Sequence, residues 1–138
     1  MSETTLVFVF GTLKRGFPLH GRGLARAHFV GFYRTARKYP MLIAGPWFAP
    51  MMLDEPGEGH RVRGELYEVD PDMLARIDRL EAVGRTGNFR KQIRIMPERF
   101  GPSCDAFTYF KARFLASPAH TEYLASYSDR RFVPPWRR

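Results

Sequence analysis

The stretch Leu6-Val7-Phe8-Val9-Phe10-Gly11-Thr12-Leu13 decides how the fold begins. Its first five residues are a continuous run of leucine, β-branched and aromatic side chains, which is typical of a strand buried on both faces. The run opens abruptly into a loop with glycines at positions 11 and 16. Such a loop can present unpaired backbone N–H groups that hold a carboxylate or an oxyanion. The other interpretation is a strand that ends in an ordinary turn.

The spacing of the two glycines also suggests a phosphate-binding P-loop. That motif requires Lys-Ser or Lys-Thr directly after the second glycine, whereas Phe17 and Pro18 follow Gly16 here. The sequence therefore argues against a nucleotide site in this loop.

The composition indicates one folded domain over residues 1–138, a common domain size, with a basic tail from about residue 130 that is either folded over the site or flexible. No segment approaches the apolar length of a membrane span. The first strand is not a signal peptide, because Glu3 precedes it and no basic residue flanks it. The single cysteine, Cys104, excludes an internal disulfide, so we expect a cytoplasmic protein.

The formal net charge of +8 raises the question of a nucleic-acid partner. The basic residues are spread along the chain among acidic ones, and no zinc-finger, basic-zipper or RNA-recognition signature accompanies them. Dispersed charge of this kind gives only non-specific attraction to anions. We expect neither a specific nucleic-acid partner nor a membrane partner, and the oligomeric state stays open.

Apolar runs and alternation predict about six strands, with turns rich in proline and glycine between them. A short helix or irregular loop is expected over 18–27, a proline-bracketed loop over 46–50, and another short helix after Ser117. Most strands are not separated by helices, which favours an α+β domain with a compact, partly closed mixed sheet and one main helix. The predicted strands cover residues 6–10, 29–36, 41–44, 61–69, 92–96 and 105–111.

The main helix is predicted to start with Asp70 as N-cap and Pro71 at its first position, and to run to about Val83 before Gly84. At about 100° per residue, one face of this helix is apolar and packs on the sheet. The apolar positions are Met73, Leu74, Ile77 and Leu80.

Glu81 breaks this pattern, because it lies four residues after Ile77 and therefore points into the apolar face. Burial and the nearby C-terminus of the helix both disfavour its negative charge, which would raise its pKa toward that of a general acid–base catalyst. The competing interpretation pairs Glu81 with an arginine, such as Arg85 or Arg90. Periodicity alone does not choose between the two.

Two motifs in this order resemble the gamma-glutamylcyclotransferase-like superfamily and, within it, the gamma-glutamylamine cyclotransferases. The first strand of these proteins ends in Tyr-Gly-Thr-Leu, which stands here as Phe10-Gly11-Thr12-Leu13 within a longer match over 7–16. The second motif is Gly-Glu-Leu-Tyr-Glu-Val at 64–69, followed by a helix that ends in Asp-Arg-Leu-Glu at 78–81. The resemblance covers most of residues 5–129.

The resemblance implies an α+β fold and a small-molecule γ-glutamyl substrate, with Glu81 as the catalytic acid/base. The α-amine of the substrate would attack its own γ-carbonyl, which gives 5-oxoproline and releases the attached amine, as with γ-glutamyl-lysine. The residues Phe10, Gly11, Thr12 and Leu13 would bind the substrate, the last three through backbone N–H groups. This chemistry needs no metal and no cofactor, and no zinc-ligand spacing relates His20, His28, His60 and His120.

Two departures from the family pattern concern the substrate. Phe10 replaces the usual tyrosine, and Phe89 stands near the position of a second tyrosine that often follows the catalytic glutamate. Lost hydroxyls change what a pocket can hydrogen-bond, so the leaving amine stays open. A protein that keeps the pocket and binds a γ-glutamyl or carboxylate ligand without turnover is the alternative function. Cys104 is expected to be a shielded structural thiol.

Overall fold

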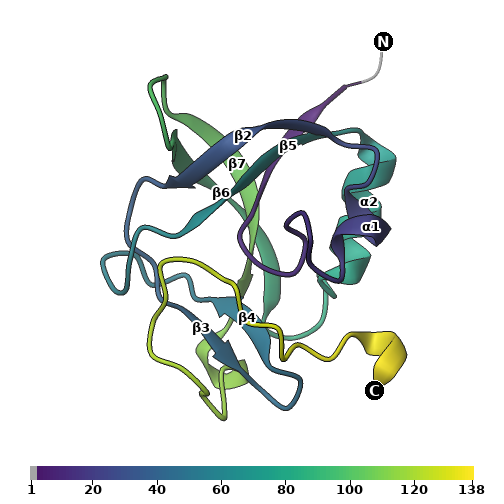
Figure 1. Cartoon of the computed structure of the whole chain (residues 1–138), viewed down its shortest axis with the longest axis vertical. Helices are drawn as coiled ribbons and strands as arrows, with labels where there is room; N and C mark the ends of the chain where they lie inside the picture. The colour runs from purple at the N-terminus through teal and green to yellow at the C-terminus, as the bar shows by residue number, and fades with distance from the viewer. Residues whose placement is uncertain (1–2) are drawn as a thin grey trace.

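The computed structural model describes residues 3–138, and a closed barrel of five strands forms its centre (Figure 1). Neighbouring strands are antiparallel except where β7 closes onto β1 through the parallel pair Val7 and Phe107. The predicted α+β class with one main helix is confirmed, and the sheet is fully rather than partly closed. In barrel order the strands are β1 (Thr5–Val9), β5 (Arg63–Val69), β2 (His28–Thr35), β6 (Asn88–Pro97) and β7 (Cys104–Lys111).

A separate hairpin of β3 (Met41–Ala44) and β4 (Ala49–Met52) lies below the barrel in Figure 1. The prediction of a loop over 46–50 was wrong at its end, because Pro50 lies within β4 and pairs with Ile43. Proline cannot donate to a ladder, so it hid this strand in the sequence. The other edge of β3 is covered by the chain near residue 120, where His120 N–H donates to Ile43 O.

The helices α1 (His20–Gly23) and α2 (Pro71–Leu80) lie together on one side of the barrel (Figure 1). The predicted N-cap is confirmed, since Asp70 Oδ1 accepts from Met73 N–H at 2.8 Å. The apolar face of α2 packs on the barrel, with Ile77 fully buried. Within residues 3–138, no helix has the length and apolar character needed to cross a bilayer.

Two helix predictions were wrong in detail. The helix α2 ends at Leu80 and not near Val83, because Ala82 adopts a left-handed conformation with φ of 55°. The segment after Ser117 is irregular, and short 3₁₀ turns stand instead at η1 (Arg113–Leu115) and η2 (Pro135–Arg137).

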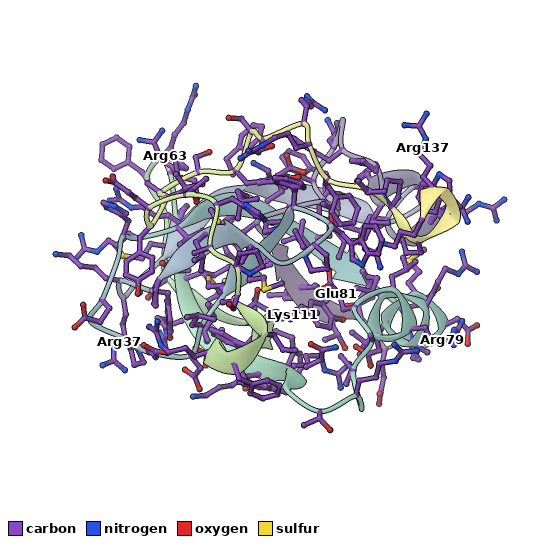
Figure 2. All side chains as sticks on the ribbon, turned by 90° about the horizontal axis from the view of Figure 1, so that it is seen from below. Arg37, Arg63, Arg79, Glu81, Lys111 and Arg137 are labelled. Atoms are coloured by element: carbon purple, nitrogen blue, oxygen red, sulfur yellow. The ribbon has the colours of Figure 1, made fainter. Side chains whose placement is uncertain are left out.

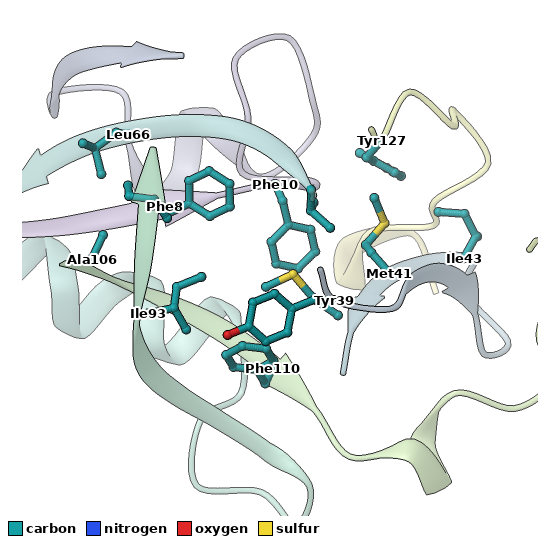
Figure 3. Close-up of a cluster of buried hydrophobic side chains, with 13 residues drawn as sticks. Phe8, Phe10, Tyr39, Met41, Ile43, Leu66, Ile93, Ala106, Phe110 and Tyr127 are labelled. Carbon is teal, nitrogen blue, oxygen red and sulfur yellow. The ribbon is translucent and has the colours of Figure 1, made fainter. Parts of the chain in front are cut away.

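The barrel interior is filled by apolar and aromatic side chains from strands of both sheets (Figure 3). Phe8 and Phe10 enter it from β1 and its end, and the tilted rings of Tyr39 and Phe110 pack near them with centroids 5.5 Å apart. This packing fixes the end of β1, and therefore the start of the loop that follows it.

Candidate active site

A cavity of about 580 Å³ lies where the loop after β1 meets the end of α2. Its walls also include the hairpin turn, the ends of β6 and β7, and the C-terminal segment from Phe132 to Arg138. All five residues predicted for the site, which are Phe10, Gly11, Thr12, Leu13 and Glu81, line this one cavity. Segments that are seventy residues apart in the chain therefore meet there.

Glu81 is the acidic residue among those that line the cavity. Burial raises the pKa of its carboxyl group, and the nearby Lys111 ammonium opposes that rise. Within residues 3–138 the carboxylate forms no ion pair and no hydrogen bond, and Arg90 pairs instead with Asp78 at 2.8 Å. The pairing of Glu81 with Arg85 or Arg90 is therefore not formed among the described residues, and the catalytic role of Glu81 stays a prediction.

The left-handed turn at the end of α2 directs Glu81 into the cavity. Val83 N–H donates to Asp78 O at 2.9 Å, and Ala82 N–H donates to Arg79 O at 3.1 Å. These two bonds form a Schellman motif, which normally has glycine where Ala82 stands. The motif ends the helix at Leu80 and leaves Glu81 as its C-cap, so the carboxylate lies at the helix end rather than within it.

The loop after β1 lines the same cavity and carries backbone N–H groups without an acceptor among the described residues. Within residues 3–138, the N–H groups of Gly11, Thr12 and Leu13 donate to no acceptor of the protein. Their carbonyls are occupied, since Gly11 O accepts from Lys14 N–H and Thr12 O from Leu19 N–H. A Cβ on Gly11 would lie 2.6 Å from the Pro50 side chain, so only glycine fits between β1 and the hairpin.

Among the cavity residues that were not predicted as site residues are Asn88, Tyr109 and Lys111. Asn88 and Lys111 face each other across the β6–β7 pair, and Lys111 Nζ lies 3.4 Å from Glu81 O. Figure 2 shows Lys111 beside Glu81. Burial lowers the pKa of Lys111 while the Glu81 charge raises it. Strand alternation places Tyr109 and Lys111 on one face of β7, and this signal could have found both.

Tyr109 fixes the last turn of α2 against the barrel. Its hydroxyl donates to Asp78 Oδ1 at 2.7 Å, and Arg90 Nη1 donates to Asp78 Oδ2 at 2.8 Å. Burial and the hydrogen bond to Asp78 raise the pKa of Tyr109, which keeps its hydroxyl protonated. Two neighbouring strands therefore hold the turn that carries Glu81.

Several other polar and aromatic side chains lie near the cavity or outside it. Lys14 is partly buried outside the cavity, where its Nζ donates to Tyr127 O at 2.8 Å. Burial raises the pKa of the Cys104 thiol, which disfavours the thiolate. Trp47 lines the cavity, whereas Phe48 stacks on His120 with ring centroids 4.2 Å apart. Flexibility of the tail from about residue 130 stays a prediction.

The site combines a carboxyl group of raised pKa, three free N–H donors and the Lys111 ammonium. It can accept a proton, return it, and stabilise a negative oxygen. In the described part of the chain, no three His, Cys, Asp or Glu side chains come together as metal ligands.

Residues 7–130 match the family described as gamma-glutamyl cyclotransferase, AIG2-like. The chain belongs to this family. The gamma-glutamylaminecyclotransferase of Bos taurus is 38% identical over 128 residues, which are 90% of this chain and 76% of the bovine protein. A relative from Arabidopsis thaliana is 48% identical over 99 residues, which cover 68% of this chain and 52%, about half, of the plant protein.

The crystal structure of a mouse AIG2-like protein superposes with a TM-score of 0.87 at 32% identity. The superposition covers 99% of each chain. The barrel, the hairpin and the overall path of this chain are therefore those of the gamma-glutamyl cyclotransferase, AIG2-like family.

Proposed function

We propose that this protein is a cyclotransferase that acts on γ-glutamylamines, releases the amine and forms 5-oxoproline. One observation carries the proposal: the Glu81 carboxylate, which has no partner among residues 3–138, lies in the same cavity as the loop whose N–H groups have no acceptor within that range. Family membership and the name of the bovine relative support it. We also propose a cytoplasmic location, because Cys104 has no cysteine partner in the chain.

Glu81 serves in this proposal as the base and then as the acid. Its carboxylate takes a proton from the α-ammonium, and the freed amine attacks the γ-carbonyl carbon to form the new C–N bond. The carbonyl oxygen becomes an oxyanion, which the N–H groups of residues 11–13 stabilise. The original amide C–N bond then breaks as Glu81 returns the proton to the leaving nitrogen. The ring nitrogen then loses a second proton, which the released amine takes up, so the amine leaves as its ammonium ion.

Intramolecular attack explains why a cavity with one acid–base residue suffices. The nucleophile and the electrophile belong to one molecule, so holding the folded-over conformer supplies much of the rate acceleration. The aromatic rings around the cavity, such as Trp47 and Phe132, provide apolar walls for that conformer.

The decisive experiment measures 5-oxoproline and free amine from a panel of γ-glutamyl compounds. We expect equal amounts of both products from γ-glutamyl-ε-lysine and from γ-glutamyl alkylamines. The matched control is the same compound with its α-amine acetylated, which cannot cyclise and should release no amine. Free glutamate in place of 5-oxoproline would indicate a hydrolase. Binding of every compound without any turnover would indicate the non-catalytic binding module.

A further inference from the structure

The C-terminal segment forms part of the cavity wall. Val133 N–H donates to Trp47 O at 3.0 Å, and the Arg22 guanidinium carbon lies 3.7 Å from the centre of the Trp136 ring. Phe132, Pro135 and Arg138 all line the cavity. The segment is therefore fixed at two points and brings Arg138 to the site.

The Arg138 side chain is held in place by its contacts but has no acidic partner among the described residues. Its Nε donates to Val133 O at 2.9 Å, and its guanidinium carbon lies 4.9 Å from the centre of the Trp47 ring. Within residues 3–138 its two Nη groups form no hydrogen bond and no ion pair. These groups are the fork with which arginine binds a carboxylate in a bidentate manner.

The cavity holds more positive charge than the γ-glutamyl half of a substrate requires. Its lining includes one acidic side chain, Glu81, and four basic ones, of which Lys111 is partly buried and Arg79, Arg85 and Arg138 are exposed at the rim. The γ-glutamyl half carries a single carboxylate, which the loop N–H groups can bind. Burial lowers the pKa of Lys111, and the Arg138 charge acts in the same direction, so the two cations are within electrostatic reach. A second anionic group would relieve this repulsion.

We propose that Arg138 is a specificity-determining residue that binds a carboxylate on the leaving-amine half of the substrate. The inference rests on the proposed function and adds the group that the leaving amine should carry. The Trp47 ring under the guanidinium and the Phe132 ring beside it would line the methylene chain between the amide and that carboxylate. An amine that carries an extra ammonium group in place of the carboxylate would be rejected by the same charges.

A pair of substrates that differ in one group tests this inference. The first is γ-glutamyl-6-aminohexanoate, and the second is γ-glutamyl-hexylamine, which has a similar chain and no carboxylate. In the wild type we expect kcat/KM to favour the carboxylate. In Arg138→Gln we expect kcat/KM for the carboxylate substrate to fall by about tenfold or more, as for loss of a charge-assisted contact, with the hexylamine substrate little changed. Arg138→Lys should restore part of the preference, since it returns the charge without the fork.

Arg137 provides the matched control, because it is the adjacent arginine, does not line the cavity and points away from the molecule in Figure 2. Arg137→Gln should leave both kcat/KM values near those of the wild type. An equal change for both substrates in Arg138→Gln, or no change, would overturn the inference while leaving the proposed function intact. Absence of 5-oxoproline from both substrates with the wild type would overturn the proposed function as well.

Discussion

Two glutamates near the loop that leaves β1, the buried Glu65 and the partly buried Glu81, have opposite surroundings. Glu65 is 8% exposed, and its Oε1 accepts from Arg15 N–H at 2.9 Å and from the Tyr67 hydroxyl at 2.8 Å. Glu81 lies in the cavity without any such donor among residues 3–138. Hydrogen-bond donors around a carboxylate stabilise its charged form and the fold. Without such donors, the charged form is less stable and the carboxylate takes up a proton more readily. The two positions therefore differ chiefly in the hydrogen-bond donors around each carboxylate.

The largest expected effect follows from removing the acid–base group at the unpaired position. Glu81→Gln keeps the shape of the side chain but cannot take and return a proton, so turnover should fall at least a hundredfold, within the range of about 10²–10⁴ for general acid–base catalysis. A γ-glutamyl ligand should still bind, and Tm should not decrease. Measuring 5-oxoproline formation and Tm on one sample checks both. Near-normal turnover in a folded Glu81→Gln protein would contradict the proposed mechanism.

The loop after β1 is the next target, because its proposed role depends on the main chain. Thr12→Pro removes one N–H donor and should lower turnover by about 10²–10³, the usual cost of one oxyanion donor. Thr12→Ala keeps that donor and should retain most of the activity. Circular dichroism must show that both variants fold. Equal loss of activity in both folded variants would assign the role to the threonine hydroxyl.

At the satisfied position the expected effect concerns stability. Glu65→Ala leaves the Tyr67 hydroxyl and the Arg15 N–H without their acceptor, so the free energy of unfolding should fall by roughly 1–3 kcal/mol. Turnover per folded molecule should stay within a few-fold of the wild type, since Glu65 does not line the cavity. Urea denaturation and an activity assay below the transition measure the two quantities. A stable but inactive Glu65→Ala protein would remove the contrast between the two acids.

The smallest expected effect is a pH dependence of the free energy of unfolding, to which Glu81 should contribute. Because its folded pKa is raised above the value of 4.5, the folded state binds more protons than the unfolded state between these two values. Stability should therefore fall as pH rises from about 4.5 to the folded pKa and remain lower above it.

Glu81→Gln should lack this contribution, so its stability relative to the wild type should grow across the same pH window. Urea unfolding at several pH values from 4 to 8 measures the difference. The opposite slope, with the wild type relatively more stable at higher pH, would mean that Glu81 is paired in the folded protein.

The sequence predicted those features of the fold that depend on local pattern. The N-cap at Asp70 and the apolar face through Ile77 follow from spacing, and the same periodicity placed Glu81 toward the core. The strand that contains Pro50 was not predicted, because it is defined by its pairing with β3, in which Pro50 lies opposite Ile43. The end of α2 was missed because alanine rarely adopts the conformation of Ala82, and only the tertiary contacts of the turn enforce it.

The candidate site divides in the same way. Glu81 and the loop at 10–13 carry local signals, an acid on an apolar face and a glycine directly after a strand. Lys111 and Asn88 meet through the pairing of β6 with β7, and Arg138 reaches the cavity through the path of the C-terminal segment. Alternation along β7 could have placed Lys111 on one face of that strand, but its approach to Asn88 and Glu81, like that of Arg138, depends on segments far apart in the chain.

The contact between Gly11 and Pro50 has a consequence for how the protein responds to heat. The loop is supported on one side by the barrel and on the other by a two-stranded hairpin, and hairpins of this size are only marginally stable by themselves. Local opening is easiest in such units, so backbone amides of β3 and β4 should exchange with deuterium before those of β1 and β5. The hairpin would then unfold locally, as a cooperative unit, at a lower temperature than the barrel. Catalytic competence should disappear on warming while the barrel is still intact.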